Sequence, residues 1–248
     1  MHKRIWNLVL LFTLSTIHPV SAHPARPSFD VIIDVGHGGV DGGAVEANVY
    51  EKHINLAVAK LLYDEMDKAG YQVILNRADD HALSEDNRWL RTNSRHIKDL
   101  AQRKHLAIEL APKVMISLHA NVASNSSARG PNVLYQRNNQ SLMLADIIQH
   151  SLNRLYGIKH REPVKGRPYY LLNQSVCPTV IVEMGYLTNP GDRQALITPE
   201  HQVKLAKSIR DAVDEYFLLV GGLGQEPQEP SFWATLLHRL LEWVAVSD

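Results

Sequence analysis

Two histidines and two glutamates in this sequence stand where they could do chemistry together. His37 follows the apolar run VIIDVG, His119 closes VMISLH and Glu183 closes TVIVE, so each stands at the end of an expected strand. Glu51 opens a helical stretch after the glycine-rich loop DVGHGGVDGGA, residues 34–44. Because open α/β sheets bind ligands outside the carboxyl ends of their strands, we expect these four side chains along one edge of a sheet.

Two histidines and a glutamate are a ligand set typical of catalytic zinc, which takes three protein ligands and keeps one position for water. We expect His37, Glu51 and His119 to bind Zn²⁺. Glu183 would then be the carboxylate that is not a ligand, taking a proton from the water and passing it to a leaving amine. The sequence has no HExxH motif, which marks a zinc site on a helix, and no GxSxG motif, which marks a nucleophilic serine. Both of these kinds of hydrolase site are therefore disfavoured.

The spacing alone leaves a structural alternative open. A histidine at a strand end is often only a hydrogen-bonded structural residue, and the chain has 13 histidines, so chance pairs are easy to find. His53 lies two residues after Glu51 and would point away from it on a helix, so we expect His53 at the surface.

Strands that alternate with helices would position these residues, which predicts an α/β fold with a mostly parallel sheet covered on both faces. Residues 78–98 are polar without a clear hydrophobic period, which predicts an inserted surface segment. The proline at the start of 131–136 indicates an edge or outer strand. The predicted strands are 31–36, 71–76, 114–119, 131–136, 169–173 and 179–183. The predicted helices are 51–69, about 97–110, 141–156 and 199–219.

Composition places the chain among ordinary soluble globular proteins. Of its 248 residues 45% are hydrophobic and 21% charged, and 26 basic residues balance 26 acidic ones. This balance shows no nucleic-acid footprint, so no nucleic-acid partner is expected. Cys177 is the only cysteine, which excludes an intrachain disulfide. We expect it to be a small buried side chain, because nothing nearby would activate a catalytic thiol.

Both ends of the chain differ from its middle. Residues 1–22 have a basic start, a short apolar run and the small residues Val20-Ser21-Ala22, which predict a signal peptide and an exported protein. The alternative is an uncleaved membrane anchor. Residues 220–230 have the composition of a linker, and 231–248 form an apolar stripe typical of an amphipathic helix. That helix would either make peripheral membrane contact or pack back on its own domain.

The motifs together resemble the zinc-dependent N-acetylmuramoyl-L-alanine amidases of the amidase_3 type. The resemblance covers about residues 30–217, and it depends on IIDVGHGGVDGGA, EKHINLAVAKLL, ISLHAN, ARG and PTVIVEMGYLTNPGD in that order. It implies a twisted, mostly parallel sheet with helices on both faces, a catalytic domain at 23–219, and Zn²⁺ bound by His37, Glu51 and His119. It also implies Glu183 as the acid/base. Val35 departs from the proline that is common in the family, at a position that is neither a ligand nor catalytic.

The resemblance implies hydrolysis of the amide between N-acetylmuramic acid and L-alanine in peptidoglycan. Asn121 and Arg129 would lie in or near the cleft, where they orient substrate or serve only the loop. The chain looks most like the single-domain amidase of spore cortex maturation. The alternatives are a general cell-separation or recycling amidase, another exported zinc hydrolase such as a carboxypeptidase, and a non-catalytic wall-binding protein. Dependence on an activating protein, and binding of a divalent ion other than zinc, stay open.

Overall fold

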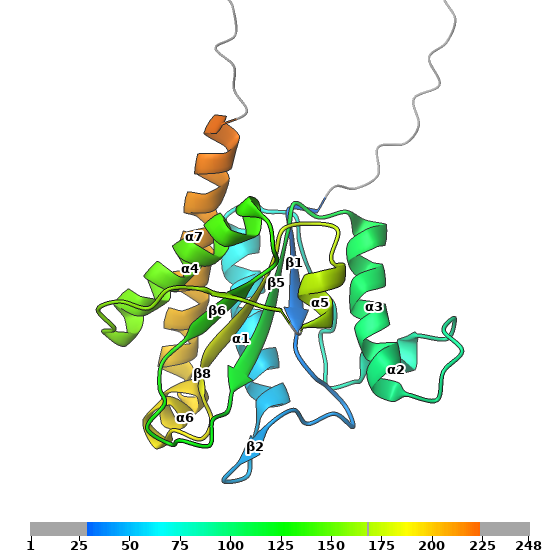
Figure 1. Ribbon diagram of the computed structural model, residues 1–248, viewed down its shortest axis with the longest axis horizontal. Helices are drawn as coiled ribbons and strands as arrows, with labels where there is room; N and C mark the ends of the chain where they lie inside the picture. Colours follow the sequence, from blue (N-terminus) through cyan, green and yellow to red (C-terminus); the bar gives the residue numbers. More distant parts are fainter. Residues whose placement is uncertain (1–28, 168, 224–248) are drawn as a thin grey trace, which may run out of the picture.

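A six-stranded mixed sheet forms the centre of the protein, with the strand order β4-β1-β5-β8-β6-β7 (Figure 1). The computed structural model describes residues 29–167 and 169–223. The strands are β1 Val31–Val35, β4 Val73–Leu75, β5 Val114–Asn121, β6 Asn132–Tyr135, β7 Val164–Lys165 and β8 Thr179–Tyr186, with β2 Val45–Glu46 and β3 Val49–Tyr50 in a separate hairpin. The helices are α1 Glu51–Lys68, α2 Leu83–Asp86, α3 Arg95–Leu110, α4 Asn139–Tyr156, α5 Tyr170–Gln174, α6 Pro190–Ile197 and α7 Pro199–Leu223.

The central strands are continuous apolar runs because helices cover both of their faces. In β8, Val180 and Val182 pack into the main core beneath α1, α4 and α7, whereas Ile181 between them faces the opposite side with Leu134 and Leu172. Helices α3 and α5 cover that opposite face (Figure 1). Strands β1, β5 and β8 run parallel, so their carboxyl ends meet at one edge of the sheet.

The predicted fold class is confirmed. The sheet is mostly parallel, and its single antiparallel pairing among the described residues is β6 with β8. The predicted strand–helix–strand unit is also present, because β1 and β4 are parallel neighbours joined through α1, with Val31 opposite Val73. The unit places the glycine-rich loop and the first turn of α1 at the carboxyl edge of the sheet.

The strand predicted at 169–173 is wrong. Residues Tyr170–Gln174 form the short helix α5, in which the Ser175 N–H donates to the Leu171 carbonyl. Leu171 and Leu172 are both buried against the sheet. A short apolar run does not by itself separate a strand from one buried turn of helix, so the run YYLLN carried no signal that could decide.

Two other predictions about surface placement need correction. Of the two alternatives for 131–136, β6 is an outer strand but not the edge of the sheet, because β7 pairs with it on the outer side. Pro131 precedes the strand and so removes no ladder hydrogen bond. The segment 78–98 is not wholly a surface insertion. It contains α2 and the start of α3, and it buries Ala82, Leu83 and Asn87.

Several sequence expectations fall partly or wholly outside the described residues. The signal peptide at 1–22 and the amphipathic helix at 231–248 lie outside them. Helix α7 extends to Leu223, into the first residues of the expected linker 220–230, and the rest of that linker also lies outside. Within the described ranges, every helix is too short or too polar to cross a lipid bilayer.

Candidate metal centre

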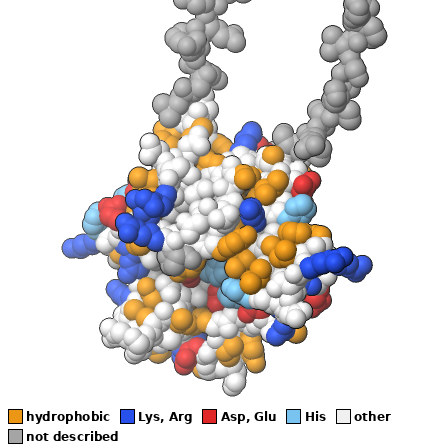
Figure 2. All heavy atoms as spheres, turned by 45° about the vertical axis from the view of Figure 1, so that its right-hand side comes forward, with side chains coloured by type: hydrophobic (Ala, Val, Ile, Leu, Met, Phe, Trp, Pro, Cys, Tyr) orange, Lys and Arg blue, Asp and Glu red, His pale blue; other side chains and the backbone are white. Residues whose placement is uncertain are grey.

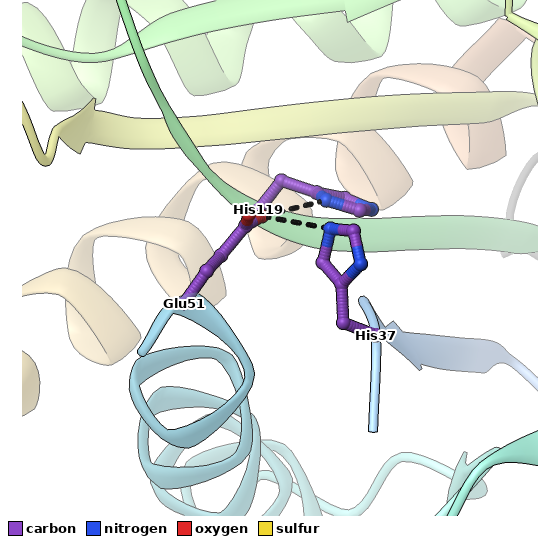
Figure 3. Close-up of side chains that lie close together, drawn as sticks. All are labelled: His37, Glu51 and His119. Carbon is purple, nitrogen blue, oxygen red and sulfur yellow. Dashed lines mark hydrogen bonds and ion pairs between the residues drawn. The ribbon is translucent and has the colours of Figure 1, made fainter. Parts of the chain in front are cut away.

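Three side chains from different elements converge at the carboxyl edge of the sheet (Figure 3). His37 follows β1 by two residues, Glu51 is the first residue of α1, and His119 lies near the end of β5. Because β1 and β5 are adjacent parallel strands, their ends deliver both imidazoles to the same place, and the loop after β1 returns there to start α1. The structure therefore brings together the three residues expected from the sequence.

The nitrogen and oxygen atoms of these side chains face one another. Glu51 Oε1 lies 3.2 Å from His37 Nε2 and 2.9 Å from His119 Nδ1, and the two imidazole rings meet edge to face. One ligand atom from each residue lies within 4.8 Å of the others. Two imidazole nitrogens and a carboxylate oxygen that converge at this distance fit a divalent cation such as Zn²⁺ with a coordination position left for water.

Glu51 is fixed before any ligand arrives. Its carboxylate is buried and accepts hydrogen bonds from the backbone N–H groups of Ala44 and Ala120, at 2.8 and 3.0 Å. Burial disfavours the charged form, but the hydrogen bonds and charges of His119 and His37 outweigh it, so the pKa of Glu51 lies well below its ordinary value. Glu51 is therefore an ionised ligand held in one orientation.

Glycines let the loop approach these side chains closely. A Cβ atom on Gly36 would lie 2.5 Å from His119 Cε1, and one on Gly43 would lie 2.6 Å from Glu51 Oε2. Gly43 also has φ +64°, a conformation that L side chains rarely adopt. The glycine-rich composition of residues 34–44 thus serves close packing of the backbone against two of the converging residues.

Asp41 orients His37, a role that was not expected from the sequence. Its Oδ2 lies 2.8 Å from His37 Nδ1, which leaves Nε2 facing Glu51. Although burial opposes the imidazolium, the hydrogen bonds that His37 donates to Asp41 and Glu51 raise the pKa of His37 to about 9. The bond from His37 lowers the pKa of Asp41 to about 2. A carboxylate that holds the far nitrogen of a histidine is usual at metal sites. The available signal was an acidic residue four positions after a histidine in a glycine loop.

Glu183 lies beside the cluster without joining its hydrogen bonds. Strand β8 places it opposite His119 of β5 on one side and opposite Asn132 of β6 on the other. Its side chain is 8% exposed, and Oε2 has no hydrogen-bond partner among the described residues. Burial raises the pKa of Glu183 to about 7, with a further rise from Glu51 and opposing effects from His119 and His37. A carboxyl group with such a pKa can both accept and donate a proton near neutral pH.

The other residues singled out from the sequence form no hydrogen bond or ion pair with His37, Glu51 or His119 within the described chain. Asn121 ends β5, and its side-chain oxygen accepts from the N–H of Val122, so it serves the local turn. Arg129 is exposed, and its carbonyl accepts from Arg161. His53 is exposed, as expected, with Nε2 3.6 Å from Asp80. Cys177 is buried, as expected, and burial raises the pKa of its thiol.

A cleft of about 170 Å³ adjoins the two histidines on the α3 and α5 side of the sheet. Figure 2 shows histidine side chains at a hollow in the surface that hydrophobic side chains flank. The walls of the cleft include Leu100 of α3, and Tyr169, Tyr170 and Leu171 at and next to α5. The sequence does not predict this wall, because its residues 169–173 are typical of a short strand.

Comparison with known proteins agrees with this geometry. The sequence model of Amidase_3, N-acetylmuramoyl-L-alanine amidase, matches residues 31–215. The uncharacterized protein YqiI of Bacillus subtilis is 30% identical over 220 residues, covering 87% of this chain and 98% of that protein. The germination-specific N-acetylmuramoyl-L-alanine amidase of Bacillus subtilis is 30% identical over 188 residues, covering 75% of this chain and 79% of that protein.

A solved structure extends the likeness to three dimensions. The CwlD amidase from Clostridioides difficile, determined in complex with the GerS lipoprotein, has a TM-score of 0.72 and 29% sequence identity, covering 77% of this chain and 100% of that chain. The family match spans the strands and helices that carry the converging residues, from β1 to α7. The chain belongs to the Amidase_3 family of N-acetylmuramoyl-L-alanine amidases, which are hydrolases.

Proposed function

We propose that this protein is a zinc-dependent amidase in which His37, Glu51 and His119 bind the metal and Glu183 is the catalytic acid/base. Its reaction would be hydrolysis of the amide that joins N-acetylmuramic acid to the L-alanine of the stem peptide. The observation that carries the proposal is that the two glutamates of the site have different environments. A charged, hydrogen-bonded Glu51 lies between the imidazoles, and the buried Glu183, with its raised pKa, lies next to them.

Each group has a defined part in this reaction. Zinc, when bound, supplies a Lewis acid that polarises the carbonyl and lowers the pKa of a water molecule. Glu183 would accept a proton from the attacking water as the water oxygen adds to the carbonyl carbon, and would then donate that proton to the amine nitrogen as the C–N bond breaks. The products are a lactyl carboxylate on the glycan and a peptide that begins with L-alanine. Asp41 holds His37 throughout, through its bond to Nδ1.

Two other activities are less well supported. A carboxypeptidase would use similar zinc chemistry, but the family match and the relatives named as amidases favour cleavage next to muramic acid. A non-catalytic wall-binding protein would need neither a complete ligand set nor a buried carboxyl group beside it. His37, Glu51, His119 and Glu183 are all present, which favours an enzyme.

Digestion of purified peptidoglycan tests the proposal. The chain without residues 1–22 is compared with Glu183→Gln, each with Zn²⁺ and after chelation, and new amino termini are identified. We expect L-alanine termini that need zinc, and a loss of rate of 10²-fold or more in the variant, which should still bind zinc. Release of terminal D-amino acids instead would indicate a carboxypeptidase. Full activity of Glu183→Gln would refute the role of Glu183.

We further propose that the enzyme acts outside the cytoplasm on spore cortex peptidoglycan. Support comes from the relative named as a germination-specific amidase. Because the CwlD structure is a complex with a lipoprotein, we propose that this chain also works with an activating protein. Rates on cortex and on vegetative peptidoglycan distinguish this role from general cell separation, since only a cortex enzyme should prefer the first. Full activity of the purified chain alone would argue against an activator.

A further inference from the structure

Arg77 is a buried cation that bonds to the backbone of the two segments that carry His37 and Glu51. It follows β4 by two residues, at the same edge of the sheet as His37 and His119, and its side chain is 1% exposed. Its guanidinium donates four hydrogen bonds within the described chain, all of them to backbone carbonyl oxygens. Burying a charged guanidinium costs free energy. A buried arginine that donates only to backbone carbonyls therefore needs an explanation.

The carbonyls that Arg77 contacts belong to the neighbours of His37 and Glu51. Nη2 donates to the carbonyls of Gly36 and Lys52, each at 3.1 Å, and Nε donates to Val35 at 3.3 Å. Gly36 directly precedes His37, and Lys52 directly follows Glu51. One nitrogen atom therefore joins the loop that carries His37 to the helix turn that carries Glu51.

The turn after Arg77 makes a second connection across the same gap. Nη1 of Arg77 donates to the Asp79 carbonyl at 2.8 Å, which fixes the turn. The neighbouring Asp80 carboxylate accepts from the Gly39 N–H at 2.8 Å and from Lys52 Nζ at 2.7 Å. Lys52 Nζ also donates to the Gly39 carbonyl at 2.7 Å. Residues 77–80 thus hold the loop that carries His37 against the first turn of α1, which carries Glu51.

The loop needs such support because its backbone is strained. His37 has φ +61°, in the left-handed region that residues other than glycine rarely adopt. Gly38 has φ +143°, and a Cβ atom there would lie 2.9 Å from Arg77 Nε and 2.2 Å from the His81 carbonyl oxygen. The glycine therefore leaves room for the arginine against the loop.

The second buried arginine of the site, Arg103, has a different chemical setting. It forms ion pairs with Asp34 at 2.7 Å and Asp99 at 2.6 Å, so neutralisation of its charge accounts for much of its burial. Arg77 bonds only to carbonyl dipoles, which favour its charge less than a carboxylate would. The contribution of Arg77 is to fix the relative position of the two segments that it joins, at Gly36 and Lys52.

We propose that Arg77 is a positioning residue that sets the separation of His37 and Glu51, and thereby the metal affinity of the site. The inference rests on the proposed metal centre and adds a residue outside it. A planar guanidinium can address two carbonyls and the turn at fixed angles, whereas a lysine ammonium cannot reproduce that fork. Loss of Arg77 would let the loop relax from its strained conformation and move His37 away from Glu51.

Zinc titration of the folded protein tests this inference against a merely structural role. The variants are Arg77→Met and Arg77→Lys, and the control is Leu152→Ala, a fully buried core position in α4 beneath the sheet. The readouts are the melting temperature, the Kd for Zn²⁺ against a competing chelator, and the visible absorption of the Co²⁺ form. The binding measurements are made well below the melting temperature of every variant. If Arg77→Met does not fold, Arg77→Lys carries the test.

We expect both Arg77 variants to raise the Kd for zinc by at least tenfold and to alter the Co²⁺ spectrum, as for other residues that hold metal ligands in place. Leu152→Ala should lower the melting temperature and leave both metal readouts unchanged. A Kd within twofold of wild type in the Arg77 variants would overturn the inference while leaving the metal centre intact. A wild-type protein that binds no zinc would refute the metal centre, and the role of Arg77 with it.

Discussion

The two glutamates of the site show how environment divides one kind of side chain into two roles. Glu51 accepts hydrogen bonds from two backbone N–H groups and lies next to two imidazoles, so its charge is favoured despite burial. Glu183 is also buried, but its Oε2 has no partner in the described chain. The sequence alone could suggest both residues from their places at element ends. It could not show which one is ionised, because that depends on contacts made by Ala44, Ala120 and the histidines.

The raised pKa of Glu183 predicts that replacing it will stabilise the metal-free protein in a pH-dependent way. Ionising a carboxyl group whose folded pKa is about 7 and whose ordinary value is 4.5 disfavours folding. The cost is absent below pH 4.5, grows as the pH rises to 7, and is then constant. Glu183→Gln stays neutral, so its free energy of unfolding should rise relative to wild type across this window, by about 3 kcal/mol.

Urea denaturation of chelator-treated protein between pH 4.5 and 8 measures this gain. The same substitution at Glu109, exposed on α3, is the control for the loss of one carboxyl group from the surface. A difference between Glu183→Gln and wild type that is the same at every pH would mean that Glu183 titrates normally in the folded protein.

Gly43 offers a second test at the level of a single residue. Gly43→Ala would place a Cβ atom 2.6 Å from Glu51 Oε2 and 2.7 Å from His37 Cδ2, and should weaken zinc binding by at least tenfold. Gly157→Ala is a matched control, because its φ of +63° is nearly the same as the +64° of Gly43 and its Cβ would meet open space. Both variants should lose about 1 kcal/mol of stability from backbone strain.

Isothermal titration with Zn²⁺ separates these two effects. Equal zinc affinities of Gly43→Ala and Gly157→Ala would show that the loop has room for a side chain after all, and that the close approach to Glu51 is not required.

At the scale of elements, helix α3 supports the site from the opposite side to α1. Its Arg103 is 3% exposed, pairs with Asp34 and Asp99, and donates to the carbonyls of Val35 and His37. The periodicity of the sequence predicted the helix to within two residues of its observed start at Arg95. It did not predict the ion pair, because Asp34 and Arg103 are 69 residues apart and nothing local relates them.

Arg103→Met should destabilise the protein strongly. It would leave Asp34, which is fully buried, without its cation, and such a loss costs about 3–5 kcal/mol. Arg210→Met removes a partly exposed pair with Asp214 in α7 and should cost less than about 1 kcal/mol. Urea denaturation at neutral pH gives both values. Similar losses in the two variants would mean that Asp34 finds another partner or is protonated in the folded state.

At the scale of the whole molecule, the sequence predicts the elements that are both long and buried, because their hydrophobic pattern is clear. Central strands such as β1, β5 and β8 are long apolar runs, and strand ends mark the edge at which the site forms, so fold class and the converging residues could be predicted. Short elements were not predictable in this way. The β2–β3 hairpin, β7 and α6 were not foreseen, and α5 was mistaken for a strand, because two to eight residues carry too little periodicity to decide.

Helix α7 closes the main core, which predicts where the chain can be shortened. Its Leu205, Ile209, Val213 and Tyr216 are at most 2% exposed and pack under the sheet with α1 and α4. Burying four such side chains contributes roughly 6–12 kcal/mol, comparable to the whole stability of a domain, about 5–15 kcal/mol. A chain that ends at Ile197 should therefore not fold.

A chain that ends at Leu223 keeps every one of these contacts and removes the segment expected to form an amphipathic helix. We expect it to unfold at a melting temperature close to that of the full chain, and to release L-alanine termini from soluble muramyl peptides at the same zinc-dependent rate. Calorimetry and the product assay measure these two properties independently. If the melting temperature falls by more than about 5 °C, the removed segment stabilises the domain by packing on it. If only the rate on intact peptidoglycan falls, that segment instead brings the enzyme to its insoluble substrate.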